Sequence, residues 1–393
     1  MSSVIPYGRQ EITDEDIQAV VSTLKSDFLT QGPAVAQFEN AFAKFVGAKY
    51  AVAVNNATSA LHLCALALGV RPGQKVLCTP NTFVASSNCI LYCGGDVEFV
   101  DIELNNFCLD LDLLEKKLSS APKGTYAGVV AVDFAGYPMD FRRLRKIADQ
   151  YGLWLIEDAC HAPGADFQTS DGQWHRSGSG EFADLSVFSF HPVKHIATAE
   201  GGMITTNSQK LYDQIKYLRT HGITKDPKEL TRNDGGWYYE MQSLGMNYRL
   251  PDILCALGSS QLERIEKNLQ RRRQIASKYA QAFHGLPIQC PNSESTIRHA
   301  HHLYVIQTDR RTELYNFLKS QGVYCQVHYI PIYQQPYYIE KYGKISLPQM
   351  DKYYSKALSL PMFHAMTDSE QDFVIAQVKN FFQSATLSKE STP

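Results

Sequence analysis

Lys194 is the only residue with a full charge in the stretch FSFHPVKHIATA, which spans residues 188–199. Apolar surroundings disfavour the charged form of a lysine, so they lower its pKa and make the free amine a nucleophile toward aldehydes. An exposed lysine in a turn is the simpler alternative for this residue taken alone. His191 and His195 flank the lysine, but no carboxylate or further histidine follows at metal-ligand spacing, which disfavours a metal site.

A second group of reactive side chains follows the apolar stretch LWLIED, residues 153–158. This stretch predicts a strand that delivers Glu157, Asp158 and His161 to its carboxyl end, where ligands bind in open α/β sheets. A carboxylate at this place can pair with a protonated heterocyclic nitrogen, whereas a metal site or a structural carboxylate cluster is the alternative. Asp158 and His161 are too few for a metal site, and no other histidine or cysteine obviously joins them.

The stretch NNATSALHL, residues 55–63, predicts the end of a strand and the start of a helix. Free backbone N–H groups at a helix start, together with the hydroxyls of Thr58 and Ser59, form a cradle for a phosphate. An ordinary helix N-cap is the alternative, because serine and threonine are favoured caps.

These three features together match the contacts that pyridoxal phosphate (PLP) requires. The lysine forms a Schiff base with the cofactor, the carboxylate keeps the pyridine nitrogen protonated, and the helix start binds the phosphate. Ser189 precedes the lysine at the end of a predicted strand, and the glycines of EGG, residues 200–202, let another backbone pass closely. The combination predicts a PLP site, although each part alone has a simpler explanation.

The elements that position these residues follow an α/β pattern from about residue 50 onward. Apolar strand-like runs alternate with helical runs, and the strands expected in the second half of this region lie at 127–134, 153–158, 185–190 and 202–207. This alternation predicts a parallel-rich sheet with helices on its faces. Residues 76–95 carry no charge, but Pro80 and polar residues divide them into a strand and a helix, which argues against a membrane span.

The pattern of the sequence changes after residue 207, where long charged helical stretches follow the apolar strand-like runs. A long charged stretch from residue 256 to 283 predicts one connecting helix, and HLYVIQT, a helix near 311–321 and VYCQVHYIPIY predict a smaller α+β unit. We therefore expect an N-terminal segment with a large domain over residues 1–265 and a small C-terminal domain over residues 266–393.

Composition excludes several classes of protein. The chain has 393 residues with a formal net charge of -2, which argues against a broad surface for nucleic acid or anionic membranes. Its nine cysteines show no C-x-x-C spacing, so neither a disulfide framework nor a zinc knuckle is expected. The N-terminus turns acidic where a signal peptide needs an apolar core, so we expect a cytoplasmic protein.

Beyond these features, the chain carries in order the motifs N-A-T-S-A-L, T-F-V-A-S-S-N, E-D-A-C-H-A, F-S-F-H-P-V-K, A-E-G-G-M-I-T-T-N and G-M-N-Y-R-L-P-D. With this set it resembles the DegT/StrS sugar-nucleotide aminotransferases, which have the PLP-dependent aspartate aminotransferase-like (type I) fold. The resemblance extends from TQGPAVAQFE at residues 30–39 to VHYIPIY at residues 327–333. It implies an α/β enzyme with a large parallel-rich sheet domain and a smaller C-terminal α+β domain.

The resemblance also implies roles for individual residues at a PLP site. Lys194 would bind the cofactor covalently, and Asn247 would reach the phosphate of the neighbouring subunit, which makes a homodimer with shared active sites. For Phe83, core packing is the alternative to stacking on the pyridine ring. The remaining implied cofactor contacts are Thr58, Ser59 and Ser189 at the phosphate, Asp158 at the ring nitrogen and His161 at the ring substituents.

One subgroup of the family is the most similar. QVHYIPIYQQPYY, residues 326–338, is similar to the enzymes that use L-glutamate to aminate C4 of a UDP-4-keto-6-deoxy-N-acetylhexosamine in pseudaminic acid biosynthesis. Neighbouring subgroups use GDP- or dTDP-linked sugars, and amination at C3 is a further alternative. By this resemblance the residues near the sugar nucleotide are His191, Arg249, His328 and Tyr329.

Two other functions within the fold are disfavoured. In the sugar dehydratases of this family a histidine replaces the lysine, so the presence of Lys194 favours an aminotransferase. A PLP-binding regulator would carry a DNA-binding module, but only about 30 residues precede TQGP and the charge balance provides no basic surface.

Overall fold

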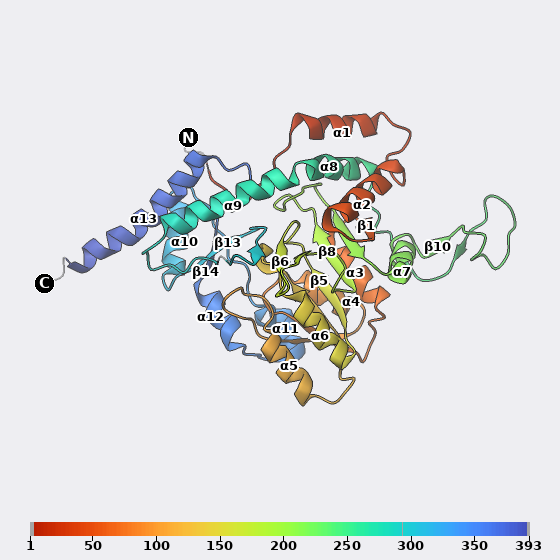
Figure 1. Ribbon diagram of the computed structural model, residues 1–393, viewed down its shortest axis with the longest axis horizontal. Coiled ribbons are helices and arrows are strands. Elements are labelled where there is room, and N and C mark those ends of the chain that lie inside the picture. The colour runs from red at the N-terminus through yellow and green to blue at the C-terminus, as the bar shows by residue number, and fades with distance from the viewer. Residues whose placement is uncertain (1–3, 293, 391–393) are drawn as a thin grey trace.

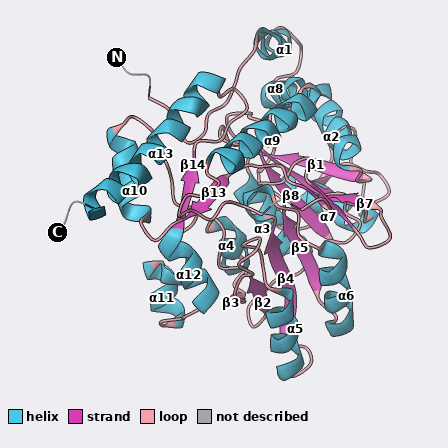
Figure 2. Ribbon diagram, turned by 60° about the vertical axis from the view of Figure 1, so that its left-hand side comes forward, coloured by secondary structure: helices cyan, strands magenta, loops and turns pink. Residues whose placement is uncertain are grey.

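The apolar runs between residues 50 and 207 form a seven-stranded sheet in the computed structural model, which describes residues 4–292 and 294–390. The strands lie in the order β1-β9-β8-β5-β4-β2-β3. Figure 2 shows the sheet surrounded by helices. The bounds are β1 (Tyr50–Val54), β2 (Lys75–Cys78), β3 (Asp96–Phe99), β4 (Tyr126–Val132), β5 (Trp154–Asp158), β8 (Leu185–Ser189) and β9 (Gly202–Thr206).

The sheet is parallel except for β9, which pairs antiparallel with both β8 and β1. The α/β class with a parallel-rich sheet is thus confirmed. A parallel neighbour requires a crossover, usually a helix, whereas residues 190–201 between β8 and β9 contain no helix. The chain therefore turns back at the carboxyl edge of the sheet, and Lys194 lies in this turn.

Alternate residues of β1 pack toward opposite faces of the sheet. Ala51 and Ala53 belong to a core shared with α2 (Pro33–Val46) and α8 (Asp252–Glu263). Val52 and Val54 belong to the largest core, which includes α3 (Ala57–Ala67) and α4 (Ala85–Tyr92). The helices not yet named in the N-terminal region are α1 (Asp14–Leu24), α5 (Leu111–Ser120), α6 (Phe141–Tyr151) and α7 (Gln209–Arg219).

Strand register brings the predicted functional segments to one edge. Gly202 of β9 lies opposite Val54 on one side and Ser189 on the other, and Asp158 of β5 lies opposite Val187 of β8. A Cβ atom at Gly202 would come within 2.7 Å of the backbone of Asn56, so only glycine lets the start of α3 approach β9 this closely.

A separate core forms in the C-terminal region around a two-stranded antiparallel sheet. Residues from the two strands, from the surrounding helices and from Ile5 near the N-terminus pack together in it. The elements are α9 (Ile265–Ala282), β13 (Tyr304–Gln307), α10 (Arg311–Ser320), β14 (Ala357–Leu360) and α13 (Asp368–Glu390). The strand at HLYVIQT and the helix near 311–321 are therefore confirmed.

The single connecting helix expected from residue 256 to 283 is wrong. Helix α8 ends at Glu263 and α9 begins at Ile265, with Arg264 between them at φ -106 and ψ 9. The Arg264 guanidinium binds the buried Asp16 carboxylate of α1 with Nη1 to Oδ1 at 2.8 Å. The charged helical pattern runs through this point, so only the departure of one residue from helical geometry reveals the break.

Part of the C-terminal region packs on the large sheet rather than around the small one. Leu303, Tyr333, Tyr338 and Met350 belong to the largest core, which also contains β2 and β4. Leu303 directly precedes β13, and the other three lie in η2 (Ile332–Gln334), α11 (Pro336–Tyr342) and α12 (Pro348–Lys356). The division between residues 265 and 266 stays a prediction.

Short elements complete the chain. A three-stranded sheet in the order β12-β6-β7 and a hairpin of β10 with β11 lie outside the central sheet, and the hairpin projects from the body of the molecule (Figure 1). Within the described ranges, no helix has the length and apolar content that a bilayer crossing requires. The bounds are η1 (Phe134–Gly136), β6 (Asp166–Gln168), β7 (Trp174–Arg176), β10 (Ile223–Thr224), β11 (Glu240–Met241) and β12 (Ile297–Arg298).

Candidate active site

A cavity of about 680 Å³ lies where β1, β5 and β8 end, at the carboxyl edge of the sheet. Its wall contains most of the residues that the sequence singled out, although they are separated by up to 271 positions in the chain (329 minus 58). The structure brings together Thr58, Ser59, Phe83, Asp158, His161, Ser189, His191, Lys194, His328 and Tyr329.

Lys194 lies in a turn directly after β8, where its backbone N–H donates to the carbonyl of His191 at 2.8 Å. The side chain is half-buried, and its Nζ is 3.3 Å from Nε2 of His302. Burial lowers the pKa of Lys194, and the negative charge of Asp158 only partly offsets this effect. The lysine therefore faces a cavity as a partly desolvated amine, which does not fit an ordinary exposed turn lysine.

Asp158 and Glu157 are adjacent in β5 but point to opposite faces of the sheet. Asp158 lines the cavity, where its Oδ2 accepts the Ser86 hydroxyl at 2.6 Å. Glu157 accepts the Ser186 hydroxyl at 2.6 Å and the Gly178 N–H at 3.0 Å, away from the cavity. The alternation of a strand thus leaves Asp158 as the carboxylate that faces a ligand.

The start of α3 presents unused donors to the cavity. Asn56 is the N-cap, and its side chain accepts the Ser59 N–H at 2.8 Å. The hydroxyls of Thr58 and Ser59 form no hydrogen bond with any described residue, so neither serves as the cap. Both hydroxyls and the positive end of the helix are therefore available to an anion. Asn56 was not predicted from the sequence as a site residue, although asparagine is a favoured N-cap.

His161 has a defined tautomer in this wall. Its Nδ1 accepts the Ala135 N–H at 3.2 Å, so the proton of the neutral ring lies on Nε2, 3.2 Å from the Tyr329 hydroxyl. Burial lowers the pKa of His161 well below its usual value, which keeps the ring neutral. Phe83 is 58% exposed at the cavity wall, so core packing does not explain it.

His302 and Tyr7 are among the residues that line the cavity without having been predicted from the sequence. His302 approaches the Lys194 amine, and its only signal in the sequence is the histidine-rich stretch RHAHH. Tyr7 comes from the N-terminal segment, which is fixed by a hydrogen bond from Met362 N–H to the Tyr7 carbonyl at 2.9 Å. The Tyr7 ring centroid is 5.5 Å from that of His328. Both contacts join distant parts of the chain, which no local pattern reveals.

Asn247 and Arg249 lie outside the cavity of their own chain. Asn247 is exposed and pairs with Thr220 through a β-bridge, and Arg249 pairs with Val54 and lines a separate cleft of about 260 Å³. Between them, the carbonyl of Tyr248 accepts the Asn55 N–H at 2.9 Å. The segment is therefore adjacent to the start of α3 but does not enter the cavity.

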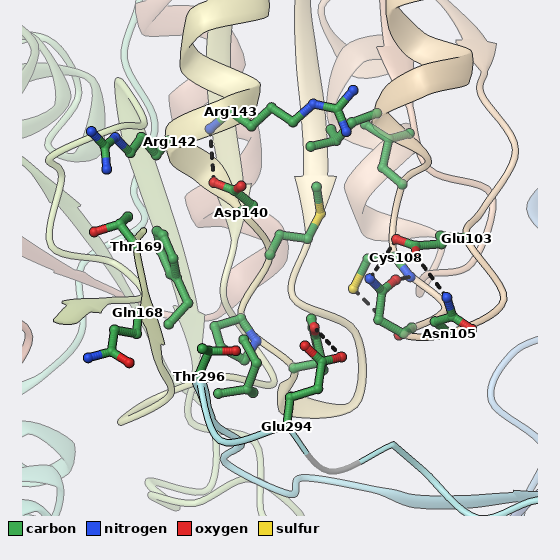
Figure 3. Close-up of a pocket in the computed structure, with 18 of the residues that line it drawn as sticks. Glu103, Asn105, Cys108, Asp140, Arg142, Arg143, Gln168, Thr169, Glu294 and Thr296 are labelled. Atoms are coloured by element: carbon green, nitrogen blue, oxygen red, sulfur yellow. Dashed lines mark hydrogen bonds between the residues drawn. The ribbon is translucent and has the colours of Figure 1, made fainter. Parts of the chain in front are cut away.

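Another cleft, of about 690 Å³, lies at the start of α6 (Figure 3). Several of its charged groups are engaged by the protein itself, because Arg142 pairs with Asp171 at 3.4 Å and Asp140 accepts the Arg143 backbone N–H at 2.9 Å. It contains no partly desolvated amine like Lys194. Among the described residues no cluster of three His, Cys, Asp or Glu side chains is arranged to hold a metal.

The cavity at the sheet edge fits PLP in three respects. It offers a half-buried amine with a lowered pKa, a carboxylate close to it, and free hydroxyls at the start of a helix. These groups match the aldehyde, the ring nitrogen and the phosphate of the cofactor.

Comparison with known proteins agrees with this geometry. The model of the DegT/DnrJ/EryC1/StrS aminotransferase family matches residues 10–379. The chain is 37% identical over 391 residues to the spore coat polysaccharide biosynthesis protein SpsC of Bacillus subtilis, covering 97% of this chain and 98% of that protein.

Two further matches are to transaminases. The chain is 37% identical over 377 residues to the UDP-4-amino-4,6-dideoxy-N-acetyl-beta-L-altrosamine transaminase of Campylobacter jejuni, covering 94% of this chain and 96% of that protein. Among solved structures, Helicobacter pylori PseC, an aminotransferase involved in the biosynthesis of pseudoaminic acid, matches with a TM-score of 0.88 at 29% identity. That match covers 97% of this chain and 100% of that chain.

Proposed function

The chain belongs to the DegT/DnrJ/EryC1/StrS aminotransferase family, and we propose that it transfers an amino group from L-glutamate to C4 of a UDP-4-keto-6-deoxy-N-acetylhexosamine. It is a PLP-dependent sugar aminotransferase. The proposed product is a 4-amino sugar nucleotide for the biosynthesis of pseudaminic acid or a related glycan.

The observation that carries the proposal is the meeting of Lys194, Asp158 and the start of α3 at one edge of the sheet. Bound PLP supplies an aldehyde that accepts the amino group and a protonated ring that acts as an electron sink. Lys194 would hold the cofactor and then move a proton between the two reacting carbons, because its amine has a lowered pKa and faces the cavity.

The other residues of the cavity would bind and orient the cofactor. Asp158 would hold a proton on the ring nitrogen, and Phe83 and His161 would contact the ring. Thr58, Ser59 and Ser189 would bind the phosphate together with the backbone N–H groups of α3. The free hydroxyls at the start of that helix support the phosphate assignment.

The proposed sugar nucleotide rests on the outer wall of the cavity and on similarity. His191, His328 and Tyr329 line the wall, and the Tyr329 hydroxyl contacts His161. The transaminase of Campylobacter jejuni named above is, by its name, a transaminase of a UDP-linked 4-amino sugar. We extend this substrate class to the present chain, with L-glutamate as the amino donor.

We also propose a homodimer with shared active sites. Asn247 and Arg249 lie beside the start of α3 but outside the cavity of their own chain, so they are placed to serve a second copy. The nearby hairpin region exposes Trp237, Met241 and Leu244 by 75%, 63% and 79%. Clustered exposed apolar side chains of this kind mark interaction surfaces.

The test is incubation of the purified enzyme with L-glutamate and a panel of 4-keto sugars linked to UDP, GDP or dTDP. Mass spectrometry and NMR then identify the product and the aminated carbon. We expect a 4-amino product from the UDP-linked sugar in preference to the others. Turnover restricted to a GDP- or dTDP-linked sugar, or amination at C3, would overturn the proposed substrate while leaving the family assignment intact.

A further inference from the structure

His302 contacts the amine of Lys194 from the C-terminal region of the chain. Its Nε2 is 3.3 Å from Nζ of Lys194, and the residue is only 4% exposed. It lies two residues before the start of β13, where the C-terminal region meets the cavity at the edge of the large sheet.

The backbone around His302 is fixed from both sides. The Ala300 N–H and the Leu303 N–H donate to the carbonyls of Gly136 and Ala135 at 2.9 and 3.2 Å. The carbonyl of His302 accepts Nη1 of the buried Arg272 at 3.3 Å. These bonds fix the backbone from which the imidazole of His302 extends.

The ring is also confined by its neighbours. The ring centroid of His161 is 4.4 Å away and that of His195 is 5.7 Å away. Burial and the nearby positive charge of Lys194 keep the pKa of His302 well below its usual value, so the ring is neutral. Two cations would not persist side by side in this place.

A neutral imidazole carries one N–H, on either Nδ1 or Nε2. With the Lys194 amine as the donor, Nε2 accepts and the proton lies on Nδ1. Nδ1 is buried and has no hydrogen-bond partner among the described residues. A buried side chain that carries an unpaired polar atom stabilises the fold less than an apolar side chain of similar volume would. Packing alone therefore does not explain a histidine at this position.

We propose that His302 is a positioning residue for Lys194, whose amine it orients by accepting one of its hydrogens at Nε2. The nitrogen lone pair of the lysine then points into the cavity rather than into a hydrogen bond. The proposal rests on Lys194 as the cofactor-binding lysine, but it does not depend on the identity of the sugar or of the amino donor.

The test uses the full-length protein after removal of its cofactor, with no sugar present. Stopped-flow absorbance measures the rate at which the protein captures PLP, and borohydride reduction with peptide mapping confirms the bond to Lys194. The equilibrium affinity for pyridoxamine phosphate is measured in parallel, because this form has no aldehyde and does not need the lysine amine. The variants are His302→Leu, His302→Gln and His302→Asn.

The matched control is His195→Gln. His195 is buried close to His302, and its Nε2 is paired with the carbonyl of Ala300 at 2.9 Å rather than with Lys194. Its Nδ1 also has no hydrogen-bond partner within the described ranges. The His195→Gln variant therefore measures the effect of replacing a buried histidine near His302 that makes no hydrogen bond with the Lys194 amine.

We expect His302→Leu to capture PLP about tenfold more slowly, as for the loss of one hydrogen bond, with unchanged affinity for pyridoxamine phosphate. Glutamine places its amide near Nε2 and should restore the rate, whereas asparagine, which reaches only the position of Nδ1, should not. The proposal is overturned if His302→Leu captures PLP at the wild-type rate, or if glutamine and asparagine behave alike. It is also overturned if the affinity for pyridoxamine phosphate falls in proportion to the rate.

If His302→Leu does not fold, the rates of PLP capture by His302→Gln and His302→Asn are compared instead. Both variants place a polar amide at this position, so a difference between them tests the contact at Nε2. Failure of the proposed function is a separate result. An enzyme that aminates none of the UDP-linked sugars would still show the capture pattern described here, since capture needs only Lys194 and the cofactor.

Discussion

At the scale of single residues, the site depends on which of two adjacent carboxylates faces the cavity. Asp158 and Glu157 are both buried at the end of β5, with 5% and 4% exposure. Burial raises the pKa of Glu157, which is held by Ser186 and Gly178 on the other face of the sheet. The two residues are thus both buried carboxylates at the end of the same strand, but only Asp158 faces the cavity.

Asp158→Asn should retain the cofactor but lower transamination at least about tenfold, because a neutral amide cannot hold the ring nitrogen protonated and each pKa unit lost costs about 1.4 kcal/mol. Glu157→Gln is the control, and we expect it to affect stability more than turnover. Cofactor content is measured by absorbance and turnover with L-glutamate. Normal turnover of Asp158→Asn with loss in Glu157→Gln would reverse the assignment.

The lowered pKa of Lys194 makes a prediction about pH. The groups that face it are Cys160, Asp158, Arg272 and His302, and burial outweighs the opposing negative charges. The amine should therefore become uncharged, and reactive toward an acylating reagent, with a midpoint below the ordinary value of 10.5. Peptide mapping of the cofactor-free protein over a pH series measures the midpoint, and a value at or above 10.5 would contradict the desolvated environment.

Replacement of the same lysine tests its role directly. Lys194→Ala should leave the fold intact and lower transamination by ~10²–10⁴-fold, the range for loss of a positioned acid or base. Borohydride reduction of the wild-type enzyme, followed by peptide mapping, should label Lys194. A label on any other lysine would show that the cofactor is bound elsewhere.

At the scale of elements, helix α3 is capped by Asn56, which leaves the hydroxyls of Thr58 and Ser59 for a ligand. Helix α5 offers a matched comparison, because its N-cap Asp110 accepts two backbone N–H groups at 2.9 Å and does not line the cavity that contains Lys194. We expect Asn56 to contribute to both stability and phosphate binding, and Asp110 to contribute to stability alone.

Asn56→Ala and Asp110→Ala should each destabilise the cofactor-free protein by about 1 kcal/mol, the usual cost of an N-cap. Only Asn56→Ala should also weaken the binding of PLP, because it disorders the donors that face the phosphate. Denaturant unfolding and cofactor titration measure the two effects. Equal cofactor affinity in both variants would show that the start of α3 does not bind the phosphate.

At the scale of the whole molecule, Asn247 and the projecting hairpin of β10 and β11 are not among the residues that line the cavity of their own chain. If Asn247 reaches the phosphate in a second subunit, Asn247→Asp places a carboxylate against a dianion and inactivates the neighbouring site. Lys194→Ala inactivates its own site. A mixed dimer of these variants has one site with both changes and one site with neither.

A 1:1 mixture under subunit exchange should therefore recover about a quarter of the wild-type sites, because half of randomly formed dimers are mixed and each has one intact site. Native mass spectrometry establishes that mixed dimers have formed, and activity is compared with each parent alone. No recovery in the presence of mixed dimers would show that each site is built from a single chain.

The sequence by itself determined the class of the fold and the main chemical groups of the site. Strand-like apolar runs, the isolated Lys194 and the acid at the end of LWLIED are local features, and their physical basis is periodicity and desolvation. The combination of these groups with the helix start at residues 55–63 predicted a PLP site, and the family motifs implied the same cofactor. The break at Arg264 was missed, because the helical pattern continues through it while one residue leaves helical geometry.

Only the tertiary structure decided which groups meet. Strand alternation turned Asp158 toward the cavity and Glu157 away, and the close approach at Gly202 set the start of α3 against β9. His302 and Tyr7 reached the site from distant segments. Contacts of this kind depend on the packing of elements far apart in the chain, so no local pattern contains them.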